Sequence, residues 1–241
     1  MRILALDSSG LVASVSVVSD GPADEEMIAE YTVNYRKTHS QTLLPMLDEI
    51  AGMTELDLKE IDAVAVASGP GSFTGLRIGS ATAKGLGLAL HKPIVEIPTL
   101  EGLACNLWGV EGIVCPIMDA RRGQVYTGIY RFENDRLVVL KDQMAVSIEE
   151  LGEMLREYEE KVTFLGDGVP VFKEALLERI LPGKNISFAP AHMNRQRAGA
   201  VGALALRYYK EGKYVEAAAH QPDYLRMSQA ERERKERGEN V

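Results

Sequence analysis

Apolar residues dominate two short stretches at the N-terminus and indicate two strands there. The stretches cover residues 2–8 and 11–19, and the tight polar turn Ser8-Ser9-Gly10 lies between them. Two strand-like runs joined by such a turn predict a β-hairpin. Residues 25–35 read EEMIAEYTVNY, and we expect a third strand there.

A helical pattern follows the third strand. Apolar residues recur at helical spacing over 43–50, which favours an amphipathic helix. Thr38 and Gln41 have the spacing of a capping box. Because proline lacks a backbone N–H, Pro45 belongs near a helix start, so we expect the regular helix to begin around residues 40–42.

The next segment predicts a buried strand and a long helix. Residues 61–67 are mostly alanine and valine, which fits a buried parallel strand. The loop Gly69-Pro70-Gly71-Ser72 ends this strand, and we expect a helix over 73–90. The elements expected after it are a strand at 94–97, a helix from Thr99 and a strand at 113–118.

The second half of the chain repeats this order. A strand, an aspartate-bearing turn and a strand over 113–132 correspond to the first hairpin. A strand, the turn Gly166-Asp167-Gly168 and a helix over 162–181 correspond to the buried strand, the glycine loop and the long helix. This order predicts an α/β protein of two related halves with a cleft between them.

These patterns divide the chain. We expect an N-terminal half over 1–108 and a C-terminal half over 109–193. The segment 194–212, helical over about 194–211, is expected to pack back onto the first half, and residues 213–241 form a C-terminal extension. Its charged part, Glu231–Glu239, carries four acidic and four basic residues, which is typical of a solvated helix end or frayed tail.

Composition limits the class of protein. The 241 residues carry 27 Lys and Arg against 35 Asp and Glu, a formal charge of −8, which argues against a stand-alone nucleic-acid binder. The first apolar run stops at Asp7, too early for a signal peptide, and no uncharged run approaches the roughly 18 residues of a membrane helix. We therefore expect a cytoplasmic protein, with no membrane partner and with Cys105 and Cys115 reduced.

Polar and glycine-rich loops at the presumed cleft could hold an anion. In sugar kinases, actin and related phosphotransferases, an aspartate in the first hairpin faces the metal–phosphate, although Asp, Ser and Gly are also ordinary turn residues. The string over 68–77 leads a strand into a helix, where free N–H groups can bind an anion, but it matches neither a Walker A loop nor a dinucleotide motif. The candidate phosphate-loop residues are Asp7, Ser8, Ser9, Gly69, Gly71, Gly166, Asp167 and Gly168.

Small residues recur every four positions in the long helix, at Gly75, Gly79, Ala83 and Gly87. Each interior glycine costs about 1 kcal/mol relative to alanine, and close approach of another element normally offsets such a cost. Two interpretations stay open. The helix packs closely on the chain's own sheet or a neighbouring helix, or it forms a partner or dimer interface.

Searches for a metal site or a nucleophile are negative. The histidines at 39, 91, 192 and 220 are scattered, and neither H-E-x-x-H nor G-x-S-x-G occurs. The two cysteines lack the spacing of zinc ligands. We assign no catalytic residue and no metal ligand.

Five strings together resemble the bacterial TsaB (YeaZ) family over essentially the whole chain. They are residues 4–9 (LALDSS), 39–45 (HSQTLLP), 67–79 (ASGPGSFTGLRIG), 119–126 (DARRGQVY) and 222–226 (PDYLR). The resemblance implies an actin/Hsp70/sugar-kinase-like (ASKHA) fold, with two ribonuclease-H-like halves whose mixed sheets are flanked by helices.

The same resemblance implies a role in making threonylcarbamoyladenosine beside the anticodon of tRNA. The catalytic relative, TsaD, binds metal and transfers the threonylcarbamoyl group, and TsaB is similar to a non-catalytic paralogue that binds and stabilises it. The ATPase subunit TsaE completes the assembly. The implied partners are thus TsaD, TsaE and, through the complex, tRNA, with a homodimer when the chain is alone. No tightly bound cofactor is expected, and ATP or ADP would bind at low affinity or only within the complex.

One local comparison bears on activity. TsaD carries a His-Met-Glu-Gly-His type motif for metal, and the corresponding stretch here resembles Thr99-Leu100-Glu101-Gly102-Leu103. Thr99 and Leu103 would replace the two histidines, and leucine cannot ligate a metal. The older "glycoprotease" label of this lineage gains no support from the sequence.

The family pairs through the first two helices of the N-terminal half. Carried over to this sequence, the implied partner-binding residues are Leu43, Met46, Leu47, Ile50, Gly75, Gly79, Ser80 and Ala83. Two alternatives stay open: an active nucleotide-dependent ATPase or kinase that uses Asp7 and the loops at 69–71 and 166–168, or a metalloprotease-like enzyme.

Overall fold

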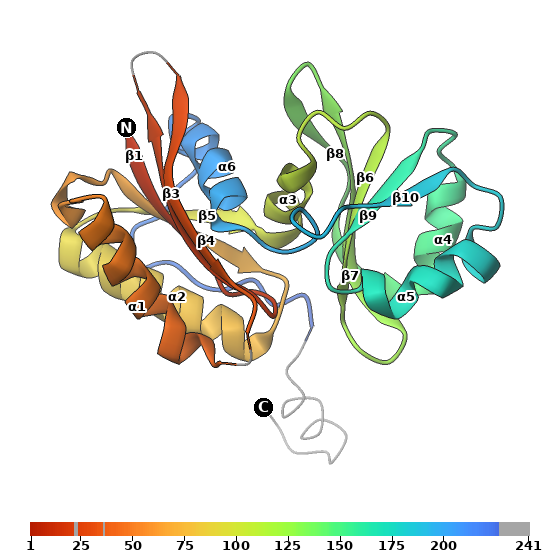
Figure 1. Ribbon diagram of the computed structural model, residues 1–241, viewed down its shortest axis with the longest axis horizontal. Coiled ribbons are helices and arrows are strands. Elements are labelled where there is room, and N and C mark those ends of the chain that lie inside the picture. The colour runs from red at the N-terminus through yellow and green to blue at the C-terminus, as the bar shows by residue number, and fades with distance from the viewer. Residues whose placement is uncertain (22–23, 36, 227–241) are drawn as a thin grey trace.

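Two mixed five-stranded sheets lie side by side in the computed structural model (Figure 1), which describes residues 1–21, 24–35 and 37–226. The first sheet has the order β3-β2-β1-β4-β5. β2 runs antiparallel to both β1 and β3, whereas β4 is parallel to β1 and β5 to β4. The strands are β1 (Arg2–Asp7), β2 (Ala13–Asp20), β3 (Glu25–Val33), β4 (Ala63–Gly69) and β5 (Ile94–Pro98).

The second sheet repeats this topology in the order β10-β9-β6-β7-β8. β7 runs antiparallel to both β6 and β8, whereas β9 is parallel to β6 and β10 is parallel to β9. The strands are β6 (Ile113–Asp119), β7 (Gln124–Glu133), β8 (Arg136–Ser147), β9 (Val162–Leu165) and β10 (Ile186–Phe188). The predicted duplication and the α/β fold of two ribonuclease-H-like halves are therefore confirmed.

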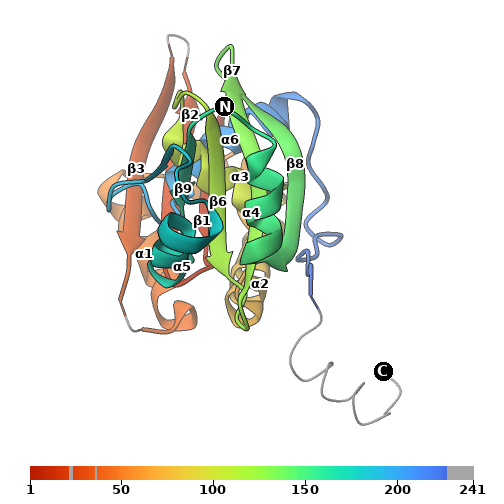
Figure 2. The ribbon, with the colours of Figure 1, turned by 90° about the vertical axis from the view of Figure 1, so that its right-hand side faces the viewer.

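Helices cover both faces of the first sheet. α1 (His39–Met53) and α2 (Phe73–Leu90) lie on one face, and α6 (Ala198–Lys210) lies on the other, against β1 and β2 (Figure 1). On the second sheet, α4 (Ile148–Arg156) and α5 (Val169–Ala175) share one face (Figure 2). The shorter elements are the 3-10 turns Leu58–Glu60 and Cys105–Leu107, helix α3 (Thr99–Ala104) and a π-helical turn over Leu176–Ile180.

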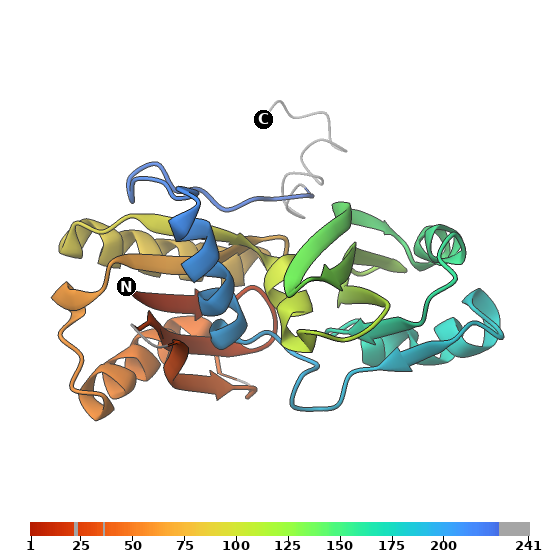
Figure 3. The same cartoon turned by 90° about the horizontal axis from the view of Figure 1, so that it is seen from above.

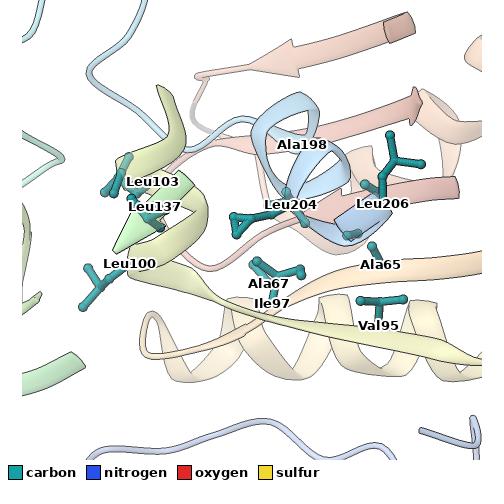
Figure 4. Close-up of a cluster of buried hydrophobic side chains, with 14 of the residues drawn as sticks. Ala65, Ala67, Val95, Ile97, Leu100, Leu103, Leu137, Ala198, Leu204 and Leu206 are labelled. Atoms are coloured by element: carbon teal, nitrogen blue, oxygen red, sulfur yellow. The ribbon is translucent and has the colours of Figure 1, made fainter. Parts of the chain in front are cut away.

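A hydrophobic core joins the two halves through α3. Leu100 and Leu103 of α3 are buried among residues of β4, β5 and α6 and among residues of the second sheet such as Leu137 (Figure 4). Alanines at positions 65 and 67 of β4 leave room for α6 above the sheet. α6 itself lies against β1 and β2 of the first sheet.

The predicted helix over 194–211 starts four residues late, at Ala198. The preceding residues are tied to the second half instead. The Asn194 Oδ1 accepts a hydrogen bond of 2.8 Å from the Gly166 N–H, and the Arg195 guanidinium donates one of 3.0 Å to the Gly166 carbonyl. These contacts hold the chain in a non-helical course up to Arg197.

The predicted capping box at Thr38 and Gln41 is wrong, because Thr38 makes no side-chain cap bond. α1 begins at His39, so Pro45 lies at its seventh residue, deeper than predicted. A full capping box does form at Ser147 and Glu150. It starts α4, a helix that the sequence analysis did not predict, as it did not predict β8 or β10.

The remaining organisational predictions are untested. Along the chain, the strands of the first sheet precede residue 108 and those of the second sheet follow it. We predict the boundary between the halves at this residue. The stretch Glu231–Glu239 lies outside the described residues. Among those described, no helix is long and apolar enough to cross a bilayer.

We expect Gly202→Leu to destabilise the protein by about 1–3 kcal/mol through overpacking. A Cβ at Gly202 would lie 2.8 Å from a methyl of Val18, where α6 crosses the sheet. Urea denaturation would measure the loss. The matched control is Ala203→Leu, because the next position of α6 is exposed; equal losses for the two variants would contradict this account.

Candidate functional site in the cleft between the halves

A cavity of about 280 Å³ lies where the two halves meet at the turns after β1 and β6. Each half contributes one side. The first half supplies Ser9, Gly10, Leu11, Gly71 and Ser72, and the second supplies Met118, Asp119, Ala120, Arg121, Tyr126 and Asp167. The cavity therefore combines small, closely packed loops with four ionisable side chains, those of Asp119, Arg121, Tyr126 and Asp167.

Asp7 ends β1 and is buried behind the cavity. Its Oδ1 accepts hydrogen bonds from the Ser9 N–H at 2.9 Å and from the Ser9 hydroxyl at 2.7 Å. Burial raises the pKa of Asp7 to about 6, although the bonds from Ser9 and the nearby His39 oppose the shift. A carboxyl group with such a pKa can hold or release a proton near neutral pH.

Glycines let the first hairpin turn lie directly on the start of α2. A Cβ at Gly71 would be 2.3 Å from the Ser9 carbonyl oxygen, and one at Gly75 would be 2.1 Å from the Ser8 carbonyl oxygen. The Ser8 hydroxyl donates a hydrogen bond of 2.8 Å to the Gly75 carbonyl, and the Ser72 N–H donates one of 2.7 Å to the Ser9 carbonyl. Any side chain at either glycine would separate these two loops.

The second half forms its side of the cleft in the same way. A Cβ at Gly166 would be 2.2 Å from the Ile117 carbonyl oxygen, and one at Gly168 would be 2.9 Å from it. Between them, Asp167 accepts a hydrogen bond of 3.1 Å from the Asp119 N–H, and burial raises the pKa of Asp167.

The structure brings three of the eight candidate phosphate-loop residues to the cavity: Ser9, Gly71 and Asp167. The others lie in the shell that supports it. Asp119 also lines the cavity, although it was not among the predicted site residues, and its Oδ2 is 3.0 Å from the Arg121 guanidinium. The sequence contains a signal for Asp119, because this residue opens the turn at 119–123 as Asp7 opens the corresponding turn at 7–10. Phosphate binding by these loops stays a prediction.

The stretch Thr99–Leu103, expected from the resemblance to correspond to a metal motif, does not fit a metal ion. The Thr99 hydroxyl accepts a hydrogen bond of 3.1 Å from the Gly69 N–H, and Leu103 lies in the core with no donor atom. Glu101 instead accepts a hydrogen bond of 2.7 Å from Tyr208. Among the described residues, no three His, Cys, Asp or Glu side chains form a group that could hold a metal ion.

The individual residues named as partner-binding need correction, because every one is buried within the chain itself. The four from α1 lie in the core beneath that helix together with Ala83 of α2, and Gly75 and Gly79 face the hairpin turn. A Cβ at Gly79, for example, would be 2.4 Å from the Ser8 Oγ. The buried set is Leu43, Met46, Leu47, Ile50, Gly75, Gly79, Ser80 and Ala83.

Other residues of α1 and α2 form an exposed small and apolar face, which we call the outer helical face. Leu44 is 54% exposed and Leu88 53%. Gly85 is exposed, and a Cβ there would meet nothing within 4 Å. The packing of this chain therefore does not explain why a glycine, which destabilises a helix, stands at position 85. The outer helical face comprises Leu44, Ala81, Gly85, Leu88 and Ala89.

Comparisons with known proteins agree with this architecture. A family model described as "TsaD: tRNA N6-adenosine threonylcarbamoyltransferase" matches residues 26–234. The tRNA threonylcarbamoyladenosine biosynthesis protein TsaB of Bacillus subtilis is 34% identical over 231 residues, 96% of each chain. TsaB of Escherichia coli is 29% identical over 233 residues, 95% of this chain and 96% of its own.

A solved structure of YeaZ from Pseudomonas aeruginosa superposes with a TM-score of 0.80 and 26% identity, over 93% of this chain and 99% of that one. The duplicated sheets and the cleft define an α/β protein of the actin and sugar-kinase class. The chain belongs to the TsaB (YeaZ) family, which shares the threonylcarbamoyltransferase family model.

We expect Asp7→Asn to stabilise the protein at pH 7.5 but not at pH 4. The pKa of Asp7 rises from 3.8 to about 6 on folding. Its ionised form is therefore disfavoured in the folded state, and stability falls as pH rises between these values. The full penalty, on the order of 1–3 kcal/mol, applies above pH 6, and the neutral amide avoids it.

Urea denaturation of both proteins at the two pH values measures this difference. Asn at this position keeps an oxygen that can accept the bonds from Ser9. An equal stability difference at pH 4 and pH 7.5 would show that Asp7 is not the titrating group.

Proposed function

We propose that this chain is a non-catalytic subunit in the synthesis of threonylcarbamoyladenosine in tRNA, and that it binds and stabilises the catalytic TsaD subunit. Family membership assigns the chain a role in tRNA threonylcarbamoyladenosine biosynthesis. The chain is also similar to the transferase itself. Over 113 residues it is 32% identical to the tRNA N6-adenosine threonylcarbamoyltransferase of Kosmotoga olearia, 42% of this chain and 34% of that one.

The observation that carries partner binding is the outer helical face. Apolar side chains of α1 and α2 are exposed there around Gly85, which has open space above it. A glycine inside an exposed helix is destabilising unless something comes close to it. A helix of a partner subunit seated over Gly85 would bury the exposed leucines and use that space.

The lack of catalysis is supported by what the cleft residues do. Thr99 and Leu103, in place of the two histidines of TsaD, are used for a hydrogen bond and for core packing. Ser8 and Ser9 are committed to bonds within the chain. Transfer chemistry would then belong to the partner subunit.

The rest of the assembly follows from the same proposal. TsaE would join the pair, and tRNA would be bound mainly by the other subunits, in keeping with the −8 charge of this chain. When the partner is absent, the outer helical face would pair with a second copy. ATP or ADP would bind at low affinity or only within the complex.

We expect Gly85→Arg and Leu44→Arg each to abolish co-purification with TsaD. Each change places a charge and a long side chain on the outer helical face, where a partner helix would have to exclude them. The matched control is Val171→Arg, which adds the same charge at an exposed apolar position of the second half. Retention of TsaD by both face variants, with the control also bound, would refute the proposed interface.

Gly79→Leu does not test this interface. Gly79 faces Ser8 inside the chain, so a leucine there would disturb the fold at the cleft. Loss of binding in that variant would report on folding instead.

The second candidate function is an active nucleotide-dependent enzyme of the same fold. Two observations favour it: the pKa of about 6 for Asp7, and the cavity between the loops. Calorimetry with ATP and Mg²⁺ would distinguish the two functions. Tight stoichiometric binding with turnover by the isolated chain, lost in Asp7→Ala, would favour the enzyme.

A further inference from the structure

The segment after α6 runs along the outside of the first half and reaches the second (Figure 3). We call residues 213–226 the C-terminal strap. It includes the Pro222–Arg226 string, for which the proposed function gives no role. The strap contains one isolated bridge and no regular helix or strand of its own, so its contacts with the two halves determine its course.

The first part of the strap is fixed to β5 and α2. Val215 and Ile94 exchange two backbone hydrogen bonds of 2.9 Å. The buried His220 places Nδ1 2.6 Å from the Glu96 Oε1, and Lys84 donates a hydrogen bond of 3.1 Å to the His220 carbonyl. These contacts all belong to the first half.

The strap then crosses the glycine loop that borders the cleft. The Asp223 N–H donates a hydrogen bond of 2.7 Å to the Ser68 carbonyl. A Cβ at Gly69 would lie 2.1 Å from the Asp223 carbonyl oxygen, so this glycine makes room for the strap.

Aromatic contacts hold the next residue against α2. The ring centroids of Tyr224 and Phe73 are 4.9 Å apart, and the Arg77 guanidinium donates a hydrogen bond of 3.3 Å to the Tyr224 hydroxyl. Arg77 also lies 3.9 Å from the centre of the Phe73 ring. The three side chains thus anchor the strap at the start of α2.

Two residues of this part of the strap, Asp223 and Arg226, also bind the second half. Gln143 of β8 donates a hydrogen bond of 3.2 Å to the Asp223 carboxylate, and Arg226 donates one of 2.6 Å to the Ala120 carbonyl. Ala120 lines the cleft cavity. Residues 223–226 therefore join the two sides of the cleft with little intervening chain.

We propose that the strap locks the two halves at a fixed angle and so keeps the cleft at constant width. Two-lobed proteins with a central cleft can close around a ligand by hinge motion. Such motion here would pull Gln143 and Ala120 away from a segment that is anchored on α2 and β5. The lock is a property of the isolated chain and does not depend on the proposed function.

Spin labels on the two halves would test the lock. Thr74→Cys on α2 and Glu174→Cys on α5 are exposed positions, and the native thiols react poorly because burial raises the pKa of both Cys105 and Cys115 to about 12. Double electron–electron resonance then gives the distribution of distances between the halves. Dilution with unlabelled chain suppresses signals between molecules.

We expect one narrow distribution in the otherwise unchanged chain, and a broader distribution with a shifted mean in Gln143→Ala/Arg226→Ala. Gln143→Glu should act in the same direction, because it places a carboxylate against that of Asp223. The control is Arg122→Ala, which removes a charge from the exposed turn beside Ala120. The lock is refuted if the parent distribution is already broad, or if both strap variants keep the narrow distribution while circular dichroism shows them folded.

Discussion

The contact of the first hairpin turn with the start of α2 fixes the geometry of the cleft. Carbonyl oxygens of Ser8 and Ser9 approach Gly75 and Gly71 where a Cβ would otherwise stand. This contact fixes the end of β1, the course of the glycine loop and the position of α2 at once. The second half uses the same device, with Gly166 and Gly168 against the carbonyl of Ile117. Duplication is therefore preserved in backbone contacts even where the residues differ.

Much of the fold could be predicted because the spacing of apolar residues in the sequence indicates which segments are buried. The first hairpin, the Ala/Val strand and α2 carry strong patterns, and α2 has the predicted bounds, 73–90. β8 was missed because most of its residues are only partly buried or exposed. α4 is only nine residues long, so its capping box was the better signal.

The site was partly predictable for a related reason. Glycines mark the loops that come close together, but the sequence does not show which of them face the cavity. The choice of partner-binding residues failed because helical periodicity identifies the face that a helix buries in its own domain. Leu43 and Leu47 belong to that face, whereas Leu44 lies outside it. A partner surface must be sought among the positions that the amphipathic pattern leaves over.

Polar groups near the cleft stabilise the loops that surround it. Thr99 holds the Gly69 N–H, Ser8 holds the Gly75 carbonyl, and Asp7 holds the Ser9 turn. Each bond stabilises the loop that it joins. The loops around the cleft are thus maintained by hydrogen bonds within the chain.

Helix α2 illustrates the consequence for how such a chain can change. Gly79 faces the sheet, Gly87 faces Ala217 of the strap, and Gly85 faces outward. An insertion of one residue would turn every later side chain by about 100° around the axis, so all three faces would be misplaced together. Changes of length should therefore accumulate in the surface loops, while the register of α2 stays fixed.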